Sequence, residues 1–132
     1  MIGLDTNVLA RYLVQDEPHQ ARLATRLIES CNADNPGYVC LPVLIELVWV
    51  LGGAYGYPRH DIAEVLRDLL TVAELHIEQP DLVRQAVQAY ATGPADFADY
   101  LLGVLNAAQG CKTTYTFDKR AAKSSWHTLS AT

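Results

Sequence analysis

Hydrophobic residues along the chain switch repeatedly between two spacings, a pattern that predicts short strands interleaved with helices. Four apolar runs have the length and composition of strands, at 1–4, 38–41, 74–78 and 113–117, the last of these being the final strand expected. Between the runs, apolar residues recur at helical spacing, and Pro or Gly marks most segment ends. The predicted helices begin at Thr6 and Pro18, span 42–51 and 61–70, begin at Pro80, and run from Pro94 to Gly110.

Strands that alternate with helices predict an α/β fold with a mostly parallel sheet covered on both faces. The chain has 132 residues, of which 50% are hydrophobic and 19% charged, as in folded single domains. It contains no internal repeat, linker or low-complexity tract. We therefore expect one domain spanning residues 1–132, large enough to fold without a disulfide or a structural metal.

The cysteines and apolar stretches indicate where the protein resides. Three cysteines without Cys-x-x-Cys spacing favour neither a disulfide framework nor a zinc knuckle, so a reducing cytoplasm is the expected location. The first residues lack the basic segment of a secretory signal. The longest apolar stretch, 39–51, is shorter than the roughly 20 residues of a membrane span and contains Pro42 and Glu46. We expect a soluble protein with no membrane segment.

The net charge of −5, from 15 acidic and 10 basic residues, by itself argues against a nucleic-acid partner. The charge is uneven, however, because residues 111–132 hold four basic residues and one acidic residue. Three of these basic residues, Lys119, Arg120 and Lys123, lie close to the acidic one, Asp118. They either contact nucleic-acid phosphates or form an ordinary solvated surface, and the pattern leaves both interpretations open.

Two acidic residues come directly after predicted strands. Asp5 follows 1–4, and Asp118 follows 113–117. Ligands of open α/β sheets bind beyond the carboxyl ends of the strands, which makes both residues candidates for a functional site. Aspartate is also a favoured helix N-cap, so a purely structural role is an equal alternative for each.

Glu46 lies in a helical segment that is otherwise apolar on all sides, and we expect it to be buried. An ionised carboxylate in such a place costs several kcal/mol unless it is paired or bound to a cation. No basic residue lies between Arg26 and Arg59 to pair with it locally. A partner from elsewhere in the fold is one solution, and a bound cation is the simpler one.

Asp96 and Asp99 lie three residues apart at the start of a predicted helix, which places them near each other on one face. One of them is expected to cap the helix, and Asp96 is favoured for that role. Several carboxylates around one crevice repel each other unless a cation is present. Oxygen ligands without His or Cys match Mg²⁺ or Mn²⁺, ions that polarise phosphoryl oxygens. This chemistry indicates phosphodiester hydrolysis.

Four segments in this order and spacing resemble the PIN-domain ribonucleases, specifically the VapC-type toxins of bacterial toxin–antitoxin pairs. The segments are 2–9, 42–51, 96–102 and 115–118. The resemblance covers essentially the whole chain. It implies a PIN-like three-layer α/β/α sandwich with a central, mostly parallel sheet of four to five strands, and a Mg²⁺- or Mn²⁺-dependent endoribonuclease.

The resemblance also implies roles for individual residues. The catalytic, metal-binding quartet carried over by position is Asp5, Glu46, Asp99 and Asp118. Supporting roles fall to Asp96, through a metal-bound water, and to Thr6, Asn7 and Thr116. Tyr100 stands where many relatives have a small residue, which affects the expected shape of the pocket. Relatives act on RNA, form homodimers and bind a VapB-type antitoxin, and the same partners are expected here.

The two tryptophans and four histidines are less informative. Trp49 is expected in the core or in a dimer interface, whereas Trp126 either stacks on a base or packs against the sheet. The histidines, at positions 19, 60, 76 and 127, have no ligand spacing and are not expected to bind metal. Two other functions remain alternatives: a non-catalytic PIN-like binding module, or an aspartate-based phosphotransfer protein, although Asn7 stands where dehalogenase-type phosphatases need a second aspartate.

Overall fold

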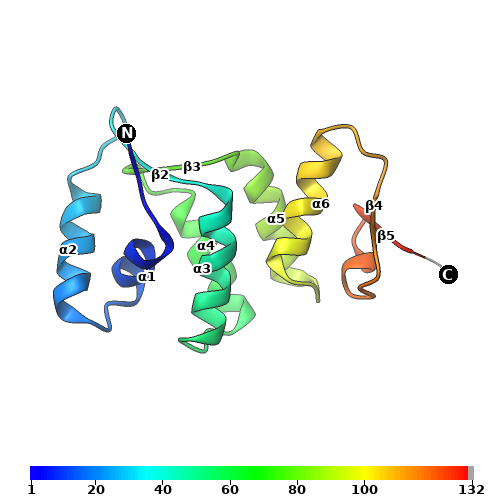
Figure 1. The fold of residues 1–132 in the computed structure, drawn as a ribbon, viewed down its shortest axis with the longest axis horizontal. Coiled ribbons are helices and arrows are strands. Elements are labelled where there is room, and N and C mark those ends of the chain that lie inside the picture. Colours follow the sequence, from blue (N-terminus) through cyan, green and yellow to red (C-terminus); the bar gives the residue numbers. More distant parts are fainter. Residues whose placement is uncertain (131–132) are drawn as a thin grey trace. The chain divides into compact units, whose positions relative to one another are not determined.

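The computed structural model describes residues 1–130, which divide into two units, Met1–Pro80 and the chain from Asp81 onward. Figure 1 shows the elements in chain order. Over the described residues there are six α-helices, five short strands and one 3₁₀ helix. The helices are α1 (Thr6–Val14), α2 (Pro18–Glu29), α3 (Leu41–Gly53), α4 (Arg59–Leu69), α5 (Pro80–Thr92), α6 (Phe97–Ala108) and the 3₁₀ helix η1 (Ala121–Lys123).

The first unit is built on a parallel sheet with strand order β1-β2-β3. The strands are β1 (Ile2–Gly3), β2 (Gly37–Val39) and β3 (Leu75–Ile77), with Ile2 opposite Gly37 and Gly37 opposite Leu75. The helix α1 packs against both α2 and α3, and α3 packs against α4. The carboxyl ends of the three strands therefore lead to Asp5, Cys40 and Glu78 at one edge of the sheet.

The N-terminus of α3 is capped by a residue distant in sequence. Cys40, in the N-cap position, makes no side-chain cap hydrogen bond. Instead, the backbone N–H of Leu41 donates to Oε1 of Glu78, at 2.8 Å. The acidic residue after β3 thus fixes the start of the helix that carries Glu46.

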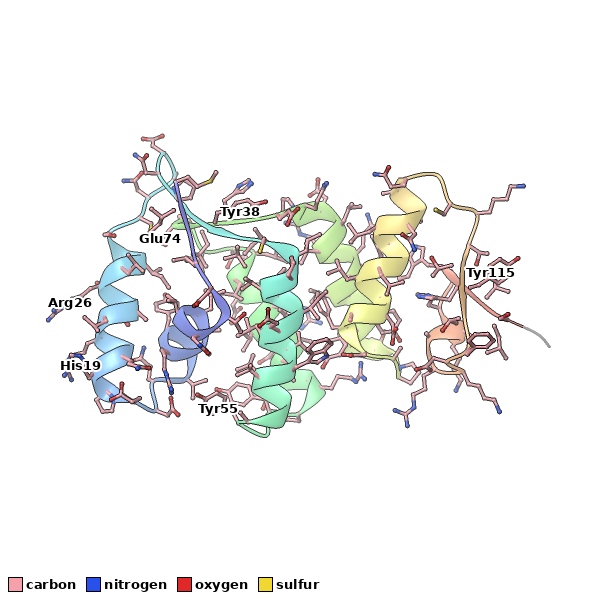
Figure 2. The ribbon with its side chains drawn as sticks, viewed as in Figure 1. His19, Arg26, Tyr38, Tyr55, Glu74 and Tyr115 are labelled. Atoms are coloured by element: carbon pink, nitrogen blue, oxygen red, sulfur yellow. The ribbon has the colours of Figure 1, made fainter. Side chains whose placement is uncertain are left out.

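The second unit contains α5, α6, η1 and the strands β4 (Thr114–Thr116) and β5 (His127–Leu129). The two strands run parallel, with Thr114 opposite His127 (Figure 1). Tyr115 of β4 is 72% exposed, and its side chain stands clear of the strand in Figure 2. Phe117, directly before Asp118, is also exposed.

Tyr100 belongs to the core of the second unit. The tyrosine hydroxyl accepts a hydrogen bond from the backbone N–H of Ala95, at 3.1 Å, and it lies where a side chain on Gly93 would stand. The adjacent rings of Tyr90 and Phe97 meet edge to face, with centroids 5.9 Å apart. Tyr100 therefore holds the turn between α5 and α6.

The structure confirms the predicted alternation of parallel strands and helices, but the main sheet has three strands over the described residues instead of the four to five expected, and two further details differ. The strand 113–117 is not the last, because β5 follows it and pairs with it. Trp49 is not in the core of its unit, because its side chain is 56% exposed. The other two strands form a separate parallel pair. Within the described residues, no helix has both the length and the apolar character needed to cross a membrane.

Candidate functional site

Asp5 ends the run through β1 and begins α1. One carboxylate oxygen, Oδ1, accepts a hydrogen bond from the backbone N–H of Val8 at 3.0 Å, which caps the helix. The structural alternative considered for Asp5 is therefore correct as far as Oδ1 is concerned. The other oxygen, Oδ2, accepts no hydrogen bond from residues 1–130, so Asp5 keeps one oxygen for a ligand while the cap fixes the orientation of the side chain.

Glu46 departs from its predicted environment. The helix α3 is apolar around most of its circumference, yet the Glu46 side chain is exposed while Leu44 and Leu47 are buried. The prediction that Glu46 is buried is therefore wrong. Because its charge is in contact with solvent, the argument from burial for a bound cation at Glu46 no longer holds. Glu46 remains placed on a helix that packs against α1, which Asp5 caps.

Asp118 is held in the same way as Asp5, at the end of β4. Its Oδ1 accepts hydrogen bonds from the backbone N–H groups of Arg120, at 2.7 Å, and Ala121, at 3.2 Å, and so caps η1. The Asp118 backbone N–H donates to Oγ1 of Thr116, at 3.0 Å. Thr116 is predicted to lie beside the site, and its hydroxyl thus fixes the backbone of Asp118, a predicted metal ligand.

Asp96 and Asp99 lie together at the start of α6. Asp96 takes the N-cap position by its backbone conformation, as predicted, although its side chain makes no cap hydrogen bond. Asp99, in the first helical turn, is half-buried. Its pKa is raised above the ordinary 3.8, first by burial and then by the charges of Asp118 and Asp96, while His127 and a backbone hydrogen bond from Asp96 act in the opposite direction.

Three carboxylates of the second unit therefore lie close enough for their charges to act on one another, which contributes to the raised pKa of Asp99. The structure brings Asp96, Asp99 and Asp118 close together, as predicted for three members of the site. Such repulsion is relieved when a cation binds, and carboxylate oxygens are the ligands that Mg²⁺ and Mn²⁺ prefer. The donor set present in this unit thus fits a hard divalent cation.

Ion pairing does not account for the predicted quartet. Within residues 1–130, none of its members forms an ion pair with Lys, Arg or His. The members are Asp5, Glu46, Asp99 and Asp118. Acidic residues placed for stability commonly have basic partners nearby, and the lack of partners here leaves these side chains available to a ligand.

The predicted supporting residues around Asp5 have separate environments. Thr6 is buried, and Asn7 is exposed. Neither side chain forms a hydrogen bond with Asp5 in the described part of the chain, where the Val8 backbone has that role. Asp5 and Asn7 line a groove of about 480 Å³ between α1 and α2, together with Val8, Arg11, Gln20, Leu23, Ala24 and Leu27.

The basic residues that follow Asp118 are exposed. Lys119 and Arg120 directly follow the acidic residue, and Lys123 ends η1. Their exposure is compatible with both interpretations of this cluster, a phosphate contact and a solvated surface.

The sequence analysis considered His127 only as a metal ligand and did not predict its burial. Its side chain is only 7% exposed, and Nδ1 shares a hydrogen bond with Oγ of Ser124 at 2.5 Å. The other ring nitrogen, Nε2, is buried without a hydrogen-bond partner among the described residues. The sequence signal that could have revealed this residue is Gly103 in α6, where an added side chain would collide with the imidazole.

A second group of possible metal ligands lies outside the predicted site. His60, Asp61 and Glu64 at the start of α4 offer ligand atoms within 4.8 Å of one another, and all three are exposed. His60 Nε2 lies 3.4 Å from Glu64 Oε1. Because exposed acidic groups often gather at a helix start without a metal, this cluster alone does not identify a binding site.

Comparison with known proteins supports the resemblance carried by the four sequence segments. The PIN domain family model matches residues 2–126. A VapC ribonuclease of Aquifex aeolicus (strain VF5) is 29% identical over 126 residues, which cover 96% of this chain and 93% of that relative. No solved structure gives a significant match. Since the family match extends through both units and nearly the whole chain, the protein belongs to the PIN domain family.

Proposed function

We propose that this PIN-domain protein is a metal-dependent endoribonuclease toxin of the VapC type, acting in the cytoplasm, with residues 1–132 forming a single domain. The family match and the similarity to a VapC ribonuclease support this activity. The observation that carries the proposal is the group of acidic residues around Asp99, whose pKa is raised first by burial and then by the charges of Asp118 and Asp96. A bound cation would relieve the repulsion between these carboxylates, which favours its binding.

In this proposal four carboxylates hold Mg²⁺ or Mn²⁺, namely Asp5, Glu46, Asp99 and Asp118. The bound ion supplies positive charge that polarises a phosphoryl oxygen of the scissile phosphodiester. The backbone caps on Asp5 and Asp118 orient those two carboxylates before the ion arrives, which lowers the cost of arranging the site. Asp96, Thr6, Asn7 and Thr116 support the ligands, and Lys119, Arg120 and Lys123 contact the RNA phosphates.

The proposal includes two protein partners. A cluster of carboxylates attracts Arg and Lys side chains, which is the chemistry expected of a VapB-type antitoxin that blocks the site. The exposed Trp49 on α3 provides an apolar contact suited to a homodimer. Membership of the family and the similarity to a VapC ribonuclease support the proposal of both partners.

Cleavage of labelled RNA by the purified full chain tests this function. Cleavage is expected with Mg²⁺ or Mn²⁺, is abolished by EDTA, and is restored by excess metal. Asp99→Asn and Asp118→Asn are expected to lose activity while remaining folded by circular dichroism. Glu64→Gln, which neutralises an exposed acidic residue on α4, is the matched control and is expected to cleave normally.

The same experiment separates the alternatives. Full activity in both aspartate variants, or in EDTA, would refute a metal-dependent site built from these residues. A folded chain that binds a basic peptide but leaves RNA intact under all conditions would instead be a non-catalytic binding module. Stable labelling of an aspartate by a small phosphodonor would indicate phosphotransfer.

A further inference from the structure

Trp126 lies where two grooves of the second unit meet. One groove, of about 380 Å³, is lined by Gln85, Gln88, Ala89, Thr92 and Trp126. The other, of about 240 Å³, is lined by the α5–α6 turn and the segment after η1, comprising Ala89, Thr92, Gly93, Pro94, Tyr100, Lys123, Ser124, Ser125 and Trp126. The half-buried indole is therefore a shared wall of both grooves.

The backbone around this indole is fixed on both sides. The backbone carbonyl of Trp126 accepts a hydrogen bond from the backbone N–H of Thr114 at 2.9 Å, and the backbone N–H of Trp126 donates to Oγ of Ser124 at 3.2 Å. The same Ser124 hydroxyl bonds to Nδ1 of His127. Ser124 thus ties together the residue that presents the indole and the buried residue that follows it.

Gly103 allows these two residues to lie directly on α6. A Cβ atom built at this position would stand 3.1 Å from Cβ of Trp126 and 2.5 Å from Cε1 of His127. The imidazole therefore occupies the space that a side chain would need, and it is buried there. The result is an aromatic ring held by a rigid support, which keeps the entropy cost of stacking on it low.

The chemistry around the ring indicates the kind of ligand. Gln85, Gln88 and Thr92 offer amide and hydroxyl groups that can pair with the edge of a base, and Lys123 offers a positive charge for a phosphate. The chain from Asp81 onward carries five basic and four acidic residues, a net charge of +1. An aromatic platform, hydrogen-bonding groups and a basic residue together match a nucleotide in a single strand.

The smaller groove is lined by residues that are neighbours of two acidic residues in the sequence. Its wall includes Gly93 and Pro94, just before Asp96, and Tyr100, just after Asp99. These sequence neighbours link the groove to the segment that carries Asp96 and Asp99.

We propose that Trp126 is a stacking platform for one base of single-stranded RNA, with Lys123 contacting the adjoining phosphate. The proposal rests on the proposed ribonuclease function and names a substrate-binding residue for it. It accounts for Gly103, Ser124 and His127 as the support of the platform. Base stacking on an aromatic side chain typically changes affinity by roughly 5- to 150-fold.

Intrinsic fluorescence provides a direct test, because the chain has two tryptophans. In a Trp49→Phe, Asp99→Asn protein, Trp126 is the sole indole and the RNA remains intact. Titration in EDTA with a single-stranded eight-nucleotide RNA is expected to quench this fluorescence, and the matching duplex is expected to quench it far less. No quenching by the single strand, or equal quenching by the duplex, would overturn the proposal.

Affinity measurements complete the test, using fluorescence anisotropy of the labelled single strand with the full chain carrying Asp99→Asn. Trp126→Ala is expected to weaken binding by roughly 5- to 150-fold and Trp126→Phe by less, whereas Tyr115→Ala, the control at an exposed aromatic residue outside both grooves, is expected to weaken it by less than about twofold. Unchanged affinity in Trp126→Ala would overturn the proposal, and the aromatic Trp126→Phe variant keeps the test valid if the alanine variant does not fold. Quenching by RNA without cleavage by the wild-type chain would refute the nuclease function alone, whereas cleavage without an effect of Trp126→Ala would refute the stacking platform alone.

Discussion

Single carboxylates in this protein serve the fold with one oxygen and leave the other for the proposed metal ion. Oδ1 of Asp5 caps α1 and Oδ1 of Asp118 caps η1, while the second oxygen of each accepts no hydrogen bond from the described residues. Capping and metal binding were competing explanations for these residues in the sequence. The geometry makes them compatible, because each function uses a different oxygen.

This division predicts different outcomes for two substitutions of Asp5. Asp5→Asn keeps the carbonyl oxygen of the cap but loses the charge, so RNA cleavage is expected to fall by at least about 100-fold. This loss is larger than is typical for a residue that only hydrogen-bonds to a metal ligand. Unfolding by urea is expected to change little. Asp5→Ala loses the cap as well and is expected to cost about 1 kcal/mol of additional stability. Equal stability of the two variants would show that the cap contributes nothing.

The raised pKa of Asp99 predicts a pH-dependent effect on stability. Since the folded chain holds this proton more tightly than the unfolded chain, the contribution of Asp99 to stability falls as the pH rises from 3.8 through the raised pKa. In metal-free buffer at neutral pH, Asp99→Asn is therefore expected to raise the urea midpoint, and the gain is expected to shrink toward pH 4. Urea titrations at both pH values check this, and a gain that grows on acidification would contradict the assigned cause.

At the level of elements, the close contact of β5 with α6 depends on one glycine. Gly103→Ala places a methyl group against His127 and Trp126, and is expected to destabilise the protein by about 1–3 kcal/mol. Gly53→Ala, at the end of α3, meets no atom within 4 Å and is expected to be neutral or slightly stabilising. Thermal unfolding of the two variants compares them directly, and similar melting temperatures would exclude tight packing at Gly103.

The helices could be predicted from the sequence because their apolar residues recur on one face. That signal fails for α3, where apolar residues surround the helix and the pattern cannot indicate that Glu46 and Trp49 are exposed. The cap that Glu78 provides for α3 could not be predicted either, since it joins residues 37 positions apart. Local patterns specify an element, but contacts distant in sequence decide what surrounds it.

The strand β5 and the buried His127 were missed for a related reason. Three residues, two of them polar, carry too little periodicity to predict a strand, and its pairing with β4 is set by backbone hydrogen bonds. Among the site residues, Asp96 and Asp118 lie close enough to Asp99 for their charges to raise its pKa, because each is placed by the start of a helix or the end of a strand. Their joint action with Asp5 and Glu46 in one metal site stays a prediction.

For the molecule as a whole, the net charge of −5 hides an unequal distribution. Met1–Pro80 carries five basic and eleven acidic residues, a net charge of −6, whereas the remainder carries +1. The overall acidity therefore says little about nucleic-acid binding. The unit that contains Asp99, Asp118 and Trp126 is the less acidic one, which suits a phosphate-rich ligand.

Binding of metal to the native state predicts stabilisation of the whole chain. At a Mn²⁺ concentration 100 times the dissociation constant, the free energy of unfolding is expected to rise by about 2.7 kcal/mol, measured as a shift in melting temperature. Asp99→Asn is expected to lose most of this shift. His60→Ala, in the exposed cluster on α4, is the control and is expected to keep it. Loss of the shift in His60→Ala alone would place the metal on α4 instead.

The capping hydrogen bonds of Asp5 and Asp118 also affect which inactivating mutations leave the protein folded. A single base change from Asp to Asn removes a negative charge but keeps the oxygen that orders the helix start. If RNA cleavage harms the cell that makes the protein, mutants of this kind escape the harm and still produce a folded chain. If the proposed antitoxin binds such inactive copies as well, they would compete with active copies for it, and the mutation would affect cells that still carry an active copy.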